Sequence, residues 1–76
     1  MPLKRDLHSM PEYIRDALRE HGLMDVYDAR PAYQRNDYLG WIARAKHEET
    51  RQKRLTQMLD ELEGGKKYMN MKWNAM

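Results

Sequence analysis

Cysteine is absent from this chain of 76 residues, which excludes disulfide bonds and thiolate metal sites. No stretch approaches the roughly 18 consecutive apolar residues of a transmembrane helix. The first residues also lack the apolar segment of a secretory signal. A chain this short has room for one hydrophobic core only. We therefore expect a cytoplasmic protein that is stabilised by helix packing or by association with a partner.

An excess of charge of one sign is also lacking, because 14 Lys and Arg residues oppose 12 Asp and Glu residues. The small positive excess lies near the end of the chain, at Lys66, Lys67 and Lys72, in a segment without acids. A dedicated nucleic-acid-binding domain usually carries a basic stripe on its folded part. The body of this chain is balanced in charge, so a protein partner is favoured over nucleic acid.

Apolar residues recur at helical spacing and predict three to four helices, at about 9–22, 23–29, 31–46 and 48–63. Ser9 is expected to cap the first helix in a capping box with Glu12, and Gly22 is expected to end it. Gly64 and Gly65 should end the last helix. The turn between the last two helices is short, which predicts antiparallel packing. The predicted fold class is all-α, a small orthogonal or bundle-like array of helices with a C-terminal arm.

The predicted organisation is a helical domain over residues 1–65, followed by a basic and aromatic tail over residues 66–76. In the tail, Met69, Met71 and Trp73 alternate with polar residues. This pattern leaves open an extended arm that lies on the helices and a disordered segment. The predicted core consists of large apolar residues on the facing sides of the helices: Ile14, Leu18, Tyr38, Trp41, Ile42, Leu55, Met58, Leu59 and Leu62.

Positive side chains gather near the turn between the last two predicted helices. The candidate interaction surface there consists of Arg44, Lys46, Thr50, Arg51 and Arg54. Thr50 and Arg51 would suit a phosphate or a carboxylate, because helix N-termini favour anions and arginine presents a planar fork of donors. The favoured alternative is that Arg51 fixes packing by pairing with a carboxylate of another helix. Its candidate partners are Asp16, Glu20 and Asp37.

The sequence predicts no catalytic residues, no cofactor site and no metal site. Ser9 is better explained as a helix cap than as a nucleophile, and no glycine-rich phosphate loop is present. His8, His21 and His47 lack the spacing of metal ligands, such as the i,i+4 pair of a zinc-binding helix. We therefore expect a chain that binds other molecules without catalysing a reaction.

The run from Tyr38 to Leu55 resembles the signature of the bacterial YdeI/OmpD-associated family, whose members are often named for bacteriocin protection. The family pattern is a Tyr, an aliphatic residue, Trp-Ile, Ala-Lys, Glu-Thr-Arg, a basic residue and an aliphatic helix that ends in Gly. The matching positions are Tyr38, Leu39, Trp41, Ile42, Ala45, Lys46, Glu49, Thr50, Arg51, Arg54, Leu55 and Gly64. The resemblance covers roughly residues 10–65, and 76 residues are not expected to have room for the N-terminal β-rich domain that many members carry.

This resemblance implies a helical domain without catalytic residues, linked by name to tolerance of agents directed at the cell envelope. The resulting hypothesis is a non-catalytic bacterial interaction module with a protein partner, active in protection against bacteriocins or in envelope stress. Two alternatives stay open. One is a nucleic-acid-binding module that uses the basic turn, and the other is a structural domain that dimerises. The expected oligomeric state is accordingly a monomer or a homodimer.

Overall fold

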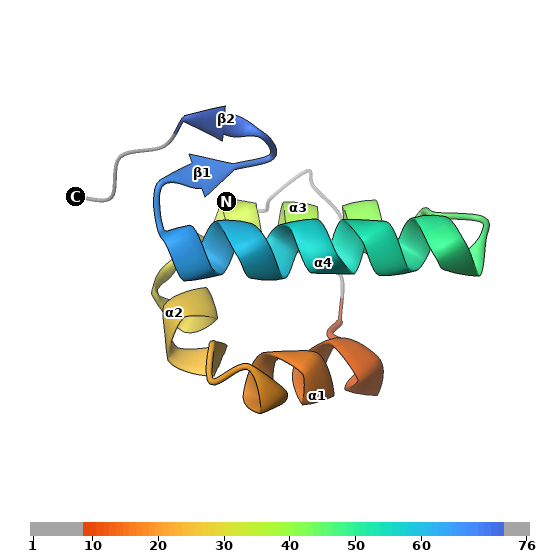
Figure 1. Ribbon diagram of the computed structural model, residues 1–76, viewed down its shortest axis with the longest axis horizontal. Helices are drawn as coiled ribbons and strands as arrows, with labels where there is room; N and C mark the ends of the chain where they lie inside the picture. The colour runs from red at the N-terminus through yellow and green to blue at the C-terminus, as the bar shows by residue number, and fades with distance from the viewer. Residues whose placement is uncertain (1–8, 73–76) are drawn as a thin grey trace, which may run out of the picture.

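The computed structural model describes residues 9–72, so the predicted roles of His8 and Trp73 lie outside the described residues. Within this range, the helices are α1 (Glu12–Glu20), α2 (Met24–Ala29), α3 (Ala32–Ala43) and α4 (Glu48–Gly64). They are followed by two short antiparallel strands, β1 (Lys67–Tyr68) and β2 (Met71–Lys72). In Figure 1, α4 is the long central element, with α1 and α2 on one side of it and the strands on the other. The predicted all-α array with a C-terminal arm is confirmed.

Glycines end α1 and α4, as the sequence predicts. Gly22 adopts φ 67°, and the next residue, Leu23, donates its N–H to the carbonyl of Leu18 at 2.8 Å. This is a Schellman ending, in which two apolar residues also meet across the helix end. Gly65 adopts φ 75° and donates its N–H to the carbonyl of Glu61 at 2.9 Å. Both turns need a left-handed residue, which glycine adopts without steric cost.

The predicted start of the first helix is wrong. Pro11 occupies the N-cap position of α1, and no side chain caps the helix there. The capping box of Ser9 and Glu12 is therefore absent, and Ser9 is exposed two residues before the cap. Proline suits this start because its missing N–H would have no partner within the helix. The third helix is shorter than predicted and ends at Ala43, where the chain tightens into the turn toward α4.

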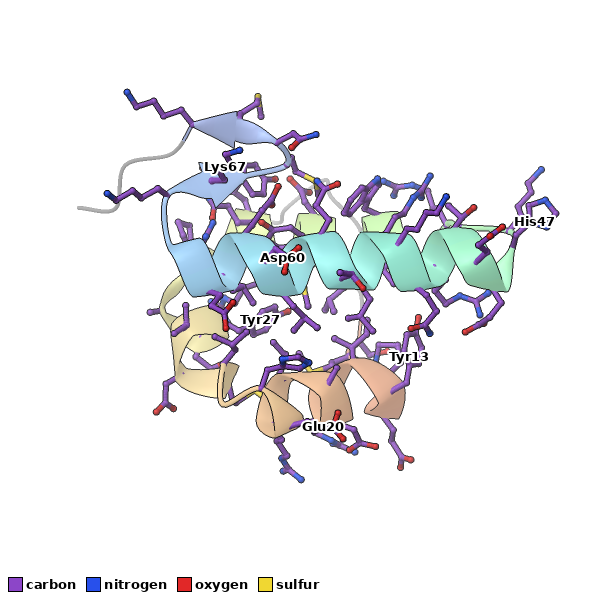
Figure 2. All side chains as sticks on the ribbon, viewed as in Figure 1. Tyr13, Glu20, Tyr27, His47, Asp60 and Lys67 are labelled. Atoms are coloured by element: carbon purple, nitrogen blue, oxygen red, sulfur yellow. The ribbon has the colours of Figure 1, made fainter. Side chains whose placement is uncertain are left out.

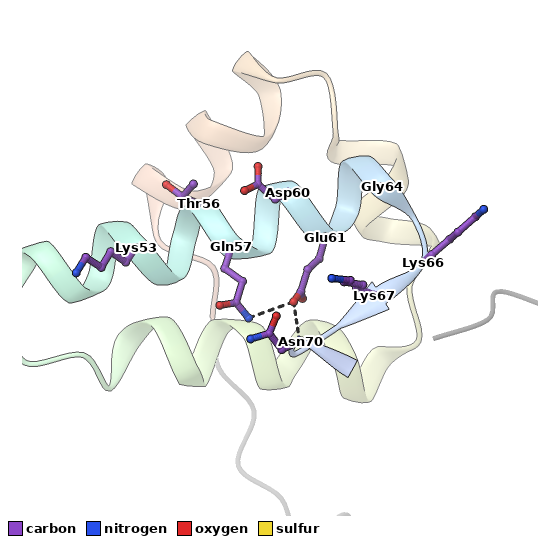
Figure 3. Close-up of a pocket in the computed structure, with 9 residues that line it drawn as sticks. All are labelled: Lys53, Thr56, Gln57, Asp60, Glu61, Gly64, Lys66, Lys67 and Asn70. Carbon is purple, nitrogen blue, oxygen red and sulfur yellow. Dashed lines mark hydrogen bonds between the residues drawn. The ribbon is translucent and has the colours of Figure 1, made fainter. Parts of the chain in front are cut away.

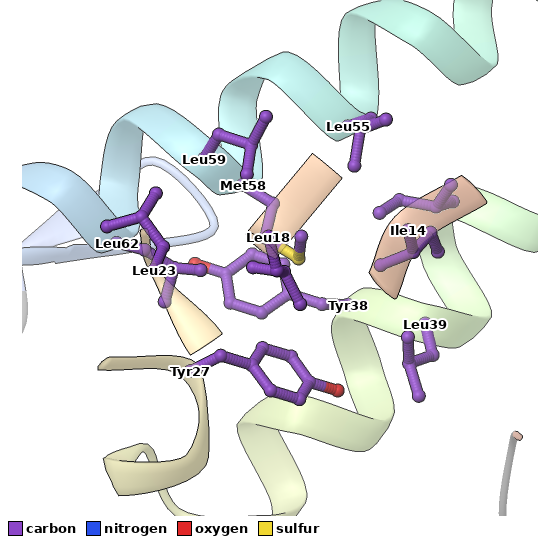
Figure 4. Packing of buried hydrophobic residues seen from close by; sticks show 11 residues of the cluster. Ile14, Leu18, Leu23, Tyr27, Tyr38, Leu39, Leu55, Met58, Leu59 and Leu62 are labelled. Carbon is purple, nitrogen blue, oxygen red and sulfur yellow. The ribbon is translucent and has the colours of Figure 1, made fainter. Parts of the chain in front are cut away.

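In the described part of the chain, one apolar cluster joins the helices (Figure 4). Its buried members are Ile14, Leu18, Leu23, Tyr27, Tyr38, Leu39, Ile42, Leu55, Met58, Leu59 and Leu62. Every predicted core residue except Trp41 lies in this buried set. Trp41 is partly buried and packs against the cluster from its edge. The difference arises because the Trp41 ring lies under the guanidinium of Arg54, which holds it at the boundary between core and solvent.

The C-terminal arm is a β-hairpin that packs against α3 and α4. The ring of Tyr68 lies edge-on to the rings of Tyr33 and Tyr38, with centroids 5.9 Å and 5.5 Å apart. Its hydroxyl donates to Asp37 Oδ2 at 2.6 Å. Such aromatic pairs contribute about 0.5–1.5 kcal/mol each beyond the area they bury. The hairpin is therefore fastened to the side of the helices that faces away from α1.

Candidate functional site

The surface predicted at the turn between α3 and α4 contains two kinds of side chain: some are exposed, and others are partly buried and make hydrogen bonds within the fold. Arg44 and Lys46 are exposed in the turn itself. Thr50, Arg51 and Arg54 are partly buried on α4. Both of these arginines donate hydrogen bonds to carbonyl groups of the fold. Within the predicted set, Arg44 and Lys46 are therefore the side chains that face solvent most fully.

Arg51 binds within the turn. Its guanidinium donates to the carboxylate of Glu48, in the same turn of α4, and to the carbonyl of Ala45 at 3.4 Å. The predicted pairing with a carboxylate of α1 or α3 is therefore wrong. The guanidinium instead donates to an acid on its own helix, Glu48, and to the carbonyl of Ala45 in the turn, both of which lie closer in the chain. The Thr50–Arg51 anion site is also less accessible than the sequence suggests, because the guanidinium points into the turn.

Arg54 joins α4 to α3 through Trp41. Its Nη1 donates to the carbonyl of Trp41 at 2.6 Å, and its Cζ lies 5.3 Å from the centre of the Trp41 ring. A cation over an aromatic ring contributes about 0.5–1 kcal/mol at an exposed site. From the sequence, Arg54 is predicted to belong to a binding surface and Trp41 to the core. In the structure, Arg54 and Trp41 are in contact with each other and hold α4 against α3.

A buried carboxylate near the end of α4 is absent from the sequence-based predictions. Glu61 is 5% exposed, and its two oxygens accept hydrogen bonds from four donors of the described residues. Oε1 accepts from the hydroxyl of Tyr38 and from the N–H of Met69 at 2.8 Å. Oε2 accepts from the N–H of Asn70 at 2.7 Å and from Gln57 Nε2 at 3.1 Å. One side chain thereby connects α3, α4 and the hairpin turn. Figure 3 shows its hydrogen bonds with Gln57 and Asn70.

The hairpin turn supplies two of these donors through its backbone conformation. Met69 and Asn70 have φ values of 51° and 66°, the left-handed pair of a type I′ turn. Asparagine tolerates this region, whereas for most residues it costs about 1–2 kcal/mol. Successive N–H groups in such turns form a concave anion site. The carboxylate of Glu61 fills that site, which helps to offset the strain at Met69.

These hydrogen bonds also keep Glu61 ionised. Burial would raise its pKa, but the hydrogen bonds from Tyr38, Asn70, Met69 and Gln57 outweigh burial, and the pKa is lowered from its ordinary value of 4.5. Burial, followed by the contact with this carboxylate, raises the pKa of the Tyr38 phenol far above its usual value. At neutral pH the phenol is therefore the donor and the carboxylate the acceptor.

We expect Glu61 to make the protein less stable in acid. Its pKa is lower in the folded than in the unfolded chain, so the unfolded state binds more protons between the two values. The stabilisation is present above the unfolded value of 4.5 and is lost as the pH falls through the folded value. Urea unfolding at a series of pH values measures this loss. Glu61→Gln should show a shallower decline, and an equally steep one would assign the acid sensitivity to other carboxylates.

A second buried polar group lies beside the same helix end. Arg30 is 3% exposed, and it donates from Nη1 to Gln34 Oε1 at 3.0 Å and from Nη2 to the carbonyl of Glu61 at 3.1 Å. Arg30 is absent from the sequence-based predictions. No local pattern marks it, because one partner lies 31 residues away. The burial of Glu61 had a weak signal in the sequence, because Glu61 follows Met58 by three residues and borders the apolar stripe of α4.

An open groove lies between α4 and the hairpin, with a volume of about 650 Å³. Its lining residues come from one face of α4 and from the hairpin: Lys53, Thr56, Gln57, Asp60, Glu61, Gly64, Lys66, Lys67 and Asn70. In Figure 2, Asp60 and Lys67 mark the α4 and β1 sides of this groove, and His47 marks the opposite end of α4. The groove and the exposed turn residues Arg44 and Lys46 are therefore separate surfaces.

Residues 9–72 contain no group of three or more His, Asp or Glu side chains that would hold a metal ion. His21 occupies the C-cap position of α1, and His47 occupies the N-cap position of α4. No helix in the same range is long and apolar enough to cross a membrane. The polar groups brought together by the fold are thus the Glu61 cluster and the groove beside it.

Fold and site together define a small helical domain closed by a C-terminal hairpin, with an open groove along its last helix. A family model described as "Bacteriocin-protection, YdeI or OmpD-Associated" matches residues 8–65, which is most of the chain. The chain belongs to this family, and the resemblance carried by the run from Tyr38 to Leu55 is confirmed. No curated protein and no solved structure shows a significant match to it.

Proposed function

We propose that the chain is a non-catalytic bacterial interaction module, which acts in the cytoplasm and protects against bacteriocins by binding a protein partner. The description of its family supports the protective role. The buried polar groups support binding over catalysis. A general acid or base must present its proton-transferring atom to a substrate. Glu61 and Tyr38 instead direct these atoms toward each other and toward the hairpin.

The groove beside α4 is the observation that carries this proposal. Pockets for small substrates are mostly apolar and bury most of the ligand. This groove is open, so a small ligand would stay largely exposed in it, and its lining combines apolar surface with charged and amide groups. Protein–protein interfaces, in contrast, are about as polar as the rest of a protein surface. A wide, open concavity of mixed polarity along α4 therefore favours a macromolecular partner.

The proposal predicts that deletion of the gene sensitises the native host to bacteriocins. The chain should restore tolerance in proportion to its amount, because a binding module works stoichiometrically, whereas an enzyme protects at trace levels. Survival assays over graded expression measure this dependence. Affinity capture from the host should retain one partner protein that saturates with the amount of bait. Unchanged survival of the deletion strain, or full protection at trace expression, would contradict the proposal.

A further inference from the structure

We propose that the groove beside α4 binds an extended acidic segment of the partner protein. The segment would place carboxylates at Lys53 and at the lysine pair Lys66 and Lys67, which lie toward opposite ends of the groove (Figure 3). This inference rests on the proposed function and adds the chemistry of the partner to it.

The charges of the groove point to an acidic partner. Lys53, Lys66 and Lys67 are exposed, and within residues 9–72 no ion pair joins them to a carboxylate. Of the two acids in the lining, Glu61 is buried and turned into the hairpin turn, where its donors stabilise its charge. Asp60 is exposed. The groove thus presents positive charge to a partner toward both of its ends, and it presents one accessible carboxylate between them.

The length of the groove fits a short extended peptide. From Lys53 to Gly64 the helix rises about 16 Å, at about 1.5 Å per residue. An extended chain covers this distance in about five residues, at about 3.3 Å each. Gln57 donates its amide N–H to Glu61, which leaves its side-chain carbonyl to accept an N–H of the peptide backbone. An acidic residue at each end of such a segment would reach the lysines.

Asp60 favours a peptide over a nucleic-acid strand. A strand carries phosphate charges along its whole length, so some of them would face this carboxylate. A peptide places a basic or uncharged residue there and keeps its acids at both ends. The groove therefore rejects one class of polyanion by repulsion while it attracts the other, which is a common source of specificity.

A blocked heptapeptide of sequence Glu-Glu-Ser-Lys-Ser-Glu-Glu, titrated into ¹⁵N-labelled protein, tests the inference. We expect amide shifts along α4 and in the hairpin, with an affinity that falls as salt rises. Lys53→Glu with Lys67→Glu should weaken binding by about tenfold or more, because like charges then face the peptide. Both side chains are exposed, so the fold is retained, which circular dichroism checks. Arg44→Glu with Lys46→Glu is the matched control and should change the affinity by less than about twofold.

Three results would overturn the inference: equal weakening by both double variants, shifts confined to the turn between α3 and α4, or tighter binding of an oligothymidylate of equal charge. Capture from the host separates this inference from the proposed function. If the Lys53→Glu, Lys67→Glu variant retains the partner equally well, the groove is not the binding site, but the proposed function is unaffected. If capture from the host yields no partner and the deletion strain is not sensitised to bacteriocins, the proposed function is wrong, even where the heptapeptide binds.

Discussion

Replacement of Glu61 with alanine is expected to lower the free energy of unfolding by about 3 kcal/mol. The change removes the acceptor of the Tyr38 hydroxyl, of two N–H groups in the hairpin turn and of Gln57. Each buried donor without an acceptor costs about 1–3 kcal/mol, although the turn donors regain water if the hairpin lifts away. A domain of this size has a total stability of about 5–10 kcal/mol, so the expected loss is large.

Urea unfolding followed by circular dichroism measures this effect, and Glu63→Ala is the matched control. Glu63 lies two residues further along α4 and is exposed, so its removal should change stability by less than about 0.5 kcal/mol. Hydrogen exchange at the amides of Met69 and Asn70 should also accelerate in the Glu61 variant. Equal stabilities of the two variants would show that the carboxylate does not hold the hairpin in place.

Replacement of Tyr38 with alanine is expected to lower the free energy of unfolding by about 3–5 kcal/mol. Among residues 9–72, Tyr38 is the largest side chain that is fully buried. Its ring lies edge-on to Tyr68 in the hairpin, and its hydroxyl donates to Glu61. Truncation opens a cavity between α3, α4 and the hairpin, and it also removes one donor from a buried anion. Thermal unfolding should show a drop in Tm of tens of degrees, since each kcal/mol shifts a small domain by about 4–8 °C.

Tyr38→Phe keeps the ring and removes only the hydroxyl, so it should cost about 1–2 kcal/mol. A loss as large as that of Tyr38→Ala would assign the effect to the hydroxyl and contradict the cavity argument. Combined with Glu61→Ala, the Phe change should be non-additive, because the two side chains share one hydrogen bond. Strictly additive losses would mean that this bond contributes nothing to stability.

Features determined by residues close together in the chain were predictable from the sequence. Gly22 and Gly65 end their helices because the left-handed conformation is a property of the residue itself. The stripe of Leu55, Met58 and Leu62 is buried because the helical period places these side chains on one face. The short connection between α3 and α4 likewise predicts two helices that pack against each other. The all-α class follows from such local patterns.

The buried polar contacts were not predictable, because their partners lie far apart in the chain. Glu61 looks like an ordinary solvated acid of α4 until Tyr38 and the hairpin turn supply its donors. Arg54 looks like part of a basic patch until Trp41 lies beneath it. The candidate surface changes for the same reason. The basic residues near the turn between α3 and α4 predict a surface there, whereas the groove exists only once the hairpin has folded back onto α4.

The contact between Glu61 and the hairpin turn has a consequence for any shortened form of the chain. The segment matched by the family ends at residue 65, just before the hairpin. A chain cut after Gly65 would keep that whole segment but leave the Glu61 carboxylate without two of its donors and Tyr38 without the Tyr68 ring. Such a fragment should melt earlier and be digested faster by proteases than the full chain. The segment that a stable fold needs therefore extends further along the chain than the segment that the family match covers.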